Sequence, residues 1–211
     1  MDPEEGRVRI RRSSCVTACL VLAAWARLVA HPSAQPACPG VMVMLQNEAG
    51  LRADLVARAA AEVVRLYSLI GVDIEWVTSV PENGGRLRSV CLVTRHSGED
   101  SLSSHVLGVT YTRPGEPKKR AHVFVERVQR ASLQFSVPIC DVLAVVIAHE
   151  LGHMLMPDGS HSKSGLMSAE LGADHFRLAS AGMLHFSPET ATVIRRGLRE
   201  EIGAPNIQIP E

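Results

Sequence analysis

The segment His149-Glu150-Leu151-Gly152-His153 brings two histidines and one glutamate within five residues. On a helix, residues four apart lie on the same face, so both imidazoles can reach a single zinc ion at about 2.0–2.1 Å. Glu150 lies one step round the helix, where it is poorly placed to bind the ion but well placed to reach a water beside it. Zinc lowers the pKa of water toward ~7, and a carboxylate can then accept the proton. The segment therefore predicts a catalytic zinc site with Glu150 as the general base.

A catalytic zinc needs a third protein ligand and keeps one position open. Pro157 cannot continue the helix, and Gly159 allows the chain to turn back, so we expect His161 to reach the same ion. The alternative third ligands are Asp158, Glu170 and Asp174.

The residues before this segment favour a metal over an accidental pattern. Val142 to Ala148 is a continuous apolar run, which predicts a helix buried on most sides. Burying two histidines and a glutamate there without partners would cost several kcal/mol. A shared metal ion removes that cost.

With His161-Ser162 and Gly165-Leu166-Met167, the segment resembles the metzincin clan of zinc proteases, and its matrixin-like members most. It is also similar to a group of bacterial secreted proteins of the same length. The resemblance implies that His149, His153 and His161 bind zinc. It further implies that Glu150 is the general base and that Met167 is the residue of a methionine turn beneath the metal. The specific motif is confined to residues 149–167, although the order of elements matches over most of residues 41–182.

The chain departs from the metzincin pattern in the turn after the zinc helix. The third histidine comes two residues later than usual, and Met156 stands where the family has a glycine. Pro157 and Gly159 must therefore make the turn. No tyrosine follows Met167, so an astacin-type tyrosine is not available there. These differences keep open a second function, a zinc-binding module without catalysis.

The elements that must position these residues follow one another in an α/β order. Apolar spacing and turn residues predict one domain with a mixed sheet against helices, and the resemblance implies a metzincin-like five-stranded sheet, a zinc-binding active-site helix, a Met-turn and C-terminal helices. Strands are predicted over residues 41–46, 72–77, 87–94, 106–112 and 121–128. Helices are predicted over residues 51–70, 138–155, 170–181 and 188–198.

One predicted strand contains Gly108-Val109-Thr110-Tyr111. In metzincins the corresponding edge strand binds the substrate backbone by strand addition. The resemblance therefore implies that residues 108–111 contact a peptide or protein substrate. An ordinary edge strand is the alternative interpretation.

The N-terminus has the composition of a secretory signal. An arginine-rich stretch, residues 7–12, precedes an uncharged apolar run of about 14 residues, Ser13 to Ala26, which is short for the roughly 20 of a membrane span. We expect cleavage near Ala30 or Ala34, with an uncleaved anchor or a buried helix of the domain as the alternatives. Residues 1–34 are thus a signal peptide or anchor, residues 38–200 the metalloprotease domain, and residues 201–211 a tail. The domain is then secreted or periplasmic.

The composition of the chain limits the kinds of partner that we expect it to bind. The chain has 211 residues, 46% of them hydrophobic, which is enough for one domain with a core. Its 22 basic and 22 acidic residues balance, so nucleic acid is not an expected partner, and a membrane is one only through the N-terminal anchor. In an oxidising compartment Cys38, Cys91 and Cys140 can form one disulfide, with no pairing indicated. The sequence thus predicts a secreted zinc endopeptidase, with hydrolysis of a non-peptide amide as a related possibility.

Overall fold

The computed structural model describes residues 40–78, 87–93, 102–112 and 119–203, all within one compact unit, Cys38–Glu211. The predicted signal or anchor over residues 1–34 lies outside the described residues, as do Cys38 and the side chain of Cys91. In the part of the chain that is described, no helix is both long and apolar enough to span a bilayer.

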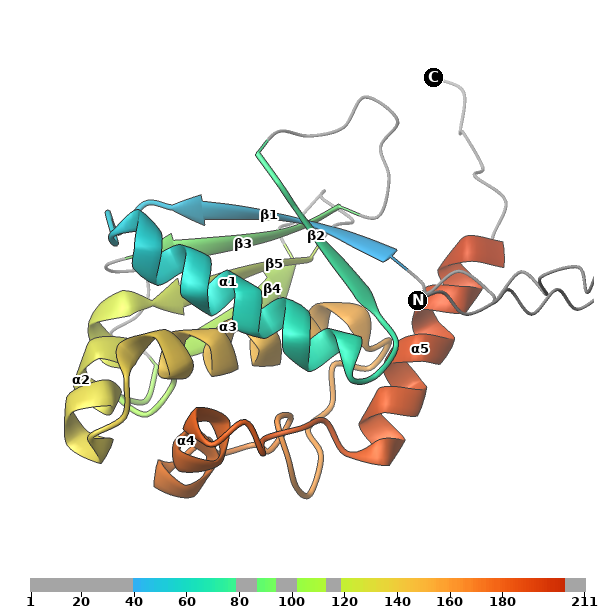
Figure 1. The fold of residues 1–211 in the computed structure, drawn as a ribbon. Coiled ribbons are helices and arrows are strands. Elements are labelled where there is room, and N and C mark those ends of the chain that lie inside the picture. The colour runs from blue at the N-terminus through green and yellow to red at the C-terminus, as the bar shows by residue number, and fades with distance from the viewer. Residues whose placement is uncertain (1–39, 79–86, 94–101, 113–118, 204–211) are drawn as a thin grey trace, which may run out of the picture. The chain divides into compact units, whose positions relative to one another are not determined.

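A mixed sheet forms one layer of the unit, with strands in the order β2-β1-β3-β5-β4 (Figure 1). β1 (Gly40–Asn47) lies parallel to β2 (Asp73–Val77) and to β3 (Leu87–Val93), and β3 lies parallel to β5 (Lys119–Phe124). β4 (Gly108–Thr112) is the last strand and runs antiparallel to β5. The predicted mixed α/β class is confirmed.

Two helices cover the same face of this sheet (Figure 1). α1 (Ala53–Ser68) follows β1 and has a buried stripe at helical spacing: Ala59, Val63, Leu66 and Tyr67. α3 (Ile139–Leu155) is buried along almost its whole length, as its continuous apolar sequence predicts. The inner faces of the strands meet these helices with Val41, Val43, Val90, Ala121 and Val123, each at most 1% exposed. The core therefore surrounds the helix that carries the histidine pair.

The strand predicted over residues 121–128 is wrong in its second half. β5 ends at Phe124, and a helix that the sequence analysis missed, α2 (Val125–Phe135), begins at the next residue. Val125, Val128 and Ala131 are buried at helical spacing, and this is the pattern that packs α2 on the core. Ser136 ends the helix in the left-handed conformation, with φ 54°.

Arg127 of α2 links this missed helix to the chain that enters β4. Arg127 is 6% exposed, and its guanidinium donates to the carbonyl oxygens of Ser103, at 2.6 Å, and Val106, at 2.7 Å. It also lies 5.1 Å from the centre of the Phe124 ring. A charge-assisted bond to each carbonyl thus fixes residues 103–106, which lead into Gly108.

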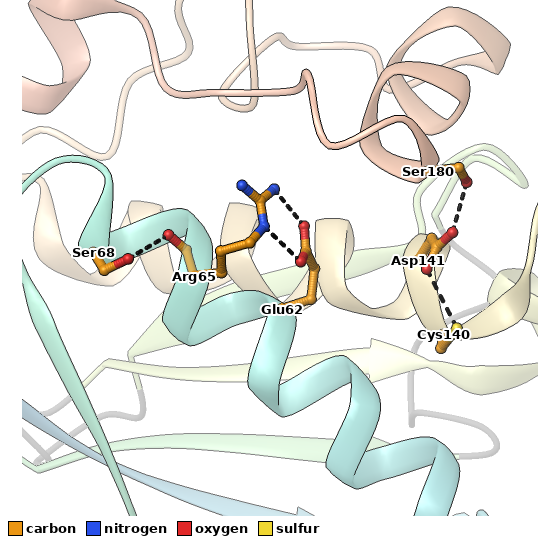
Figure 2. Close-up of polar contacts among 6 residues, drawn as sticks. All are labelled: Glu62, Arg65, Ser68, Cys140, Asp141 and Ser180. Atoms are coloured by element: carbon orange, nitrogen blue, oxygen red, sulfur yellow. Dashed lines mark hydrogen bonds and ion pairs between the residues drawn. The ribbon is translucent and has the colours of Figure 1, made fainter. Parts of the chain in front are cut away.

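Two C-terminal helices complete the unit. α4 (Ala173–Ser180) is shorter than the predicted helix over residues 170–181, and α5 (Pro188–Gly203) extends past residue 200, into the segment predicted as a tail. Ser180 at the end of α4 donates to Asp141 of α3 at 2.6 Å (Figure 2). Cys140, a buried free thiol, donates to the same carboxylate at 3.3 Å. Asp141 therefore joins the first turn of α3 to α4. On α1, Arg65 pairs with Glu62 in the other cluster of Figure 2.

Candidate metal centre and catalytic site

α3 presents His149 and His153 from one face, four residues apart, in its last two turns. The helix ends at Leu155 because Met156 adopts an extended conformation, with φ −91° and ψ 134°, as a residue before proline prefers. Gly159 then turns the chain at φ 58°, a conformation that favours glycine. This turn brings His161 back to the two helical histidines.

The three histidine rings form one cluster. Ring centroids lie 4.7 Å apart for His149 and His153, 4.7 Å for His153 and His161, and 5.4 Å for His149 and His161. One nitrogen from each ring lies within 4.8 Å of the others, so the three residues are positioned to hold a metal ion. His149 is buried, His153 is half-buried and His161 is exposed, so the cluster opens toward solvent on the His161 side.

Backbone carbonyls fix the orientation of the two helical imidazoles. Nδ1 of His149 lies 2.8 Å from the oxygen of Leu166, and Nδ1 of His153 lies 2.8 Å from the oxygen of Gly159. Because a carbonyl oxygen only accepts, both Nδ1 atoms carry the hydrogen, and each ring in its neutral form keeps a lone pair on Nε2. This second set of contacts is the arrangement that orients metal-binding histidines.

The two Nε2 atoms lie 3.0 Å from one another. Two lone pairs at that distance repel, and either a proton or a metal ion between them removes the repulsion. Burial, the largest cause, and the neighbouring His153 and His161 together lower the pKa of His149 to about 4 against the opposing bond to Leu166, so a proton on His149 is disfavoured at neutral pH. Two nitrogens of one tetrahedral zinc lie about 3.3 Å apart, which is close to the observed separation. The donor set therefore fits a metal such as zinc.

Glu150 contacts β4 through its side chain. Its side chain is 5% exposed, and burial raises its pKa to about 7 against the opposing hydrogen bond from Thr110. Thr110 Oγ1 lies 2.8 Å from Oε2 of Glu150 and 3.0 Å from its backbone oxygen. A carboxyl whose pKa is near neutral can both accept and return a proton, as a general base must.

Met167 is fully buried and packs against Gly152 of α3. A side chain at Gly152 would collide with its Sδ, so the glycine between the two histidines admits the methionine. Two backbone hydrogen bonds hold the segment around Met167. The N–H of Ser162 donates to the carbonyl oxygen of Met167 at 2.7 Å, and the N–H of Leu166 donates to the carbonyl oxygen of His185 at 2.9 Å. The same loop supplies the Leu166 carbonyl that orients His149.

The alternative third ligands lie apart from the cluster. Asp158 is exposed and accepts from the N–H of Ser160 at 3.2 Å. Glu170 is exposed and lines an open pocket of about 590 Å³ with Ser168, His175 and other residues of the loop and α4. Asp174 is exposed and pairs with Arg177. Among the described residues, the group able to hold a metal contains His161 and none of these acids.

The predicted substrate strand divides between two faces. Gly108 and Thr110 face α3 and contact Glu150, whereas Tyr111 faces the other side and its hydroxyl lies 2.7 Å from Nε2 of His122. The sequence analysis predicted that Thr110 contacts only the substrate and missed its contact with Glu150. It also missed the supporting roles of Gly152, Gly159 and Leu166. Period-two alternation along β4 was the one available signal that Gly108 and Thr110 share a face.

No protein-family model matches the chain, and no curated protein matches it.

Proposed function

We propose that the domain is a zinc-dependent endopeptidase of metzincin type. The observation that carries the proposal is the cluster of three histidines on and beside one helix, with the buried carboxyl of Glu150, of pKa about 7, next to the first of them in the sequence. His149, His153 and His161 would hold the ion, and Met167 would form the floor beneath it. The ion, when bound, supplies Lewis-acid chemistry that polarises a carbonyl and makes water easier to deprotonate.

Proton transfer and substrate binding would be carried out by the protein's own residues. The Glu150 carboxylate accepts a proton from the attacking water and returns it to the leaving amine. Among the described residues β4 is the last strand of the sheet, and the main chain of an extended peptide would pair with residues 108–111 along its outer edge by strand addition. A peptide paired with β4 would therefore lie beside the strand whose Thr110 contacts Glu150.

The deciding experiment measures metal and activity on the same purified domain. We expect one zinc per chain and cleavage of some members of an unbiased peptide library. Glu150→Gln should keep the zinc and lose activity by at least the ~10²–10⁴-fold typical of general acid–base help. A Glu150→Gln variant that cleaves at the wild-type rate would falsify the mechanism. A wild type that holds zinc and cleaves nothing would instead be a metal-binding module.

We further propose that this domain acts outside the cytoplasm. The support is the arginine-rich start and the apolar run of residues 13–26. Fractionation of cells that express the whole chain should place the domain in the medium, in the periplasm or on the outer side of a membrane. Cytoplasmic protein with an intact N-terminus would contradict this.

A further inference from the structure

Glu150 is held by two residues of β4 that lie two positions apart and face the same way. Thr110 donates through Oγ1, which lies 2.8 Å from Oε2 of the carboxyl and 3.0 Å from the backbone oxygen of the same residue. The hydroxyl therefore spans the helix backbone and the side-chain tip of Glu150. The contact joins positions 40 residues apart in the chain, so it ties α3 to the last strand of the sheet.

Gly108 is the second residue of β4 that lies against the Glu150 side chain. A Cβ at this position would lie 2.8 Å from Cγ and 2.8 Å from Oε1 of Glu150. Real Cβ atoms do not approach other atoms so closely, so any larger residue would displace the glutamate side chain. Since Glu150 is 5% exposed, little space exists for it to move into.

A glutamate side chain has three rotatable bonds, and an unrestrained one would sample several positions. Close packing against Gly108, burial and the bond from Thr110 restrict this side chain. We propose that Thr110 is a positioning residue for Glu150, with Gly108 providing the space, so that one strand sets both the substrate register and the place of the general base. This inference rests on the proposed function, because it concerns the same carboxyl. Misplacement of a reacting group by about 1 Å can cost ~10²-fold in rate, so such a restraint has a large effect.

The first test compares variants of Thr110 in the zinc-loaded domain. Thr110→Val removes the hydroxyl at nearly constant shape, and Thr110→Ser keeps it. We expect Thr110→Val to lower kcat by about 10–100-fold with KM and zinc content nearly unchanged, and Thr110→Ser to restore most of the rate. Thr112→Val is the matched control, because Thr112 is exposed at the end of the same strand. In a Glu150→Gln background, Thr110→Val should have no further effect on kcat.

The second test does not depend on activity. Denaturant unfolding of the metal-free domain is measured for wild type, Thr110→Val, Glu150→Ala and the double variant. We expect Thr110→Val to lower the unfolding midpoint at least twice as much in wild type as in the Glu150→Ala background, since the side-chain acceptor is then absent and only the backbone oxygen of residue 150 remains. Equal shifts in both backgrounds would overturn the contact.

The two tests separate the positioning of Glu150 from the proposed function. An active domain in which Thr110→Val keeps the wild-type kcat overturns the positioning while the proteolytic function stands. Coupled unfolding in a domain that binds zinc but cleaves nothing supports the restraint on Glu150 and overturns the endopeptidase. If Thr110→Val does not fold, Thr110→Ser and Thr110→Ala replace it in both tests, with the same expected order of rates.

Discussion

Gly152 of α3 lies directly against Sδ of Met167, so that no β-carbon fits between them. This contact joins α3 to the loop whose Leu166 carbonyl orients His149. A glycine inside a helix costs up to about 1 kcal/mol relative to alanine, and here it allows the close approach of Met167. The orientation of His149 in the candidate metal site thus depends on the packing of Met167 against Gly152, although neither of these two residues is a predicted ligand.

The first prediction concerns this packing. Gly152→Ala should lower the free energy of unfolding by about 1–3 kcal/mol, as overpacking does, despite the better helix propensity of alanine. It should also weaken zinc binding, because Met167 cannot move without moving Leu166. Met167→Ala makes room, so Gly152→Ala should have no further cost in that background. Chemical unfolding of the four proteins checks this, and additive losses would show that the two residues do not compete for space.

The second prediction concerns the third ligand. His161→Ala should weaken zinc binding by more than the ~10–100-fold typical of losing an outer hydrogen-bond partner, because it removes a direct ligand. Asp158→Asn and Glu170→Gln should bind zinc as wild type does. Competition with a chromophoric chelator measures the three affinities. Loss of zinc from either acid variant, with His161→Ala unaffected, would assign the ligand to that acid.

The sequence was sufficient to predict the histidine pair and most of the helices and strands, because both are local patterns of residues. A regular helical spacing at Ala59, Val63 and Leu66 is a local pattern, and so is the pair at His149 and His153. The contact of Thr110 with Glu150 is not local, since it depends on how β4 lies against α3. No spacing in the chain encodes that approach.

The missed helix α2 shows where a local pattern is ambiguous. Val123, Val125 and Val128 are β-branched residues that favour a strand, and they led the predicted strand on to residue 128. In the structure the strand ends at Phe124 because the apolar period changes there from two to that of a helix. Arg127 hid this change, since a buried arginine interrupts the apolar pattern. Sequence also left the third ligand open, because only the turn at Gly159 decides it.

The third prediction concerns Arg127. Arg127→Met keeps the apolar stem but removes the donors to the Ser103 and Val106 carbonyls. Leaving such acceptors unpaired costs about 1–3 kcal/mol, so stability should fall by that order. Hydrogen exchange should rise in residues 102–110 and much less in α1. Uniform exchange across the domain would show that the arginine does not act on the entry to β4.

The last prediction concerns Tyr67, whose hydroxyl donates to the oxygen of Ala148 at 2.9 Å, one residue before His149. Tyr67 is fully buried, and burial raises its pKa well above 10. At neutral pH, Tyr67→Phe should be less stable by about 1 kcal/mol through the lost hydrogen bond.

Alkaline pH should reverse that order. Above pH ~10 the unfolded chain releases the Tyr67 proton while the folded chain keeps it, so wild-type stability falls by up to about 1.4 kcal/mol per pH unit. Tyr67→Phe lacks this group and escapes the loss. The difference between the two proteins should therefore shrink from pH ~10 and change sign about one unit higher. Urea unfolding of both at pH 7 and at steps from 9 to 11 measures it. A difference that stays constant across that range would mean that the phenol titrates equally in both states and is not held in the core as described.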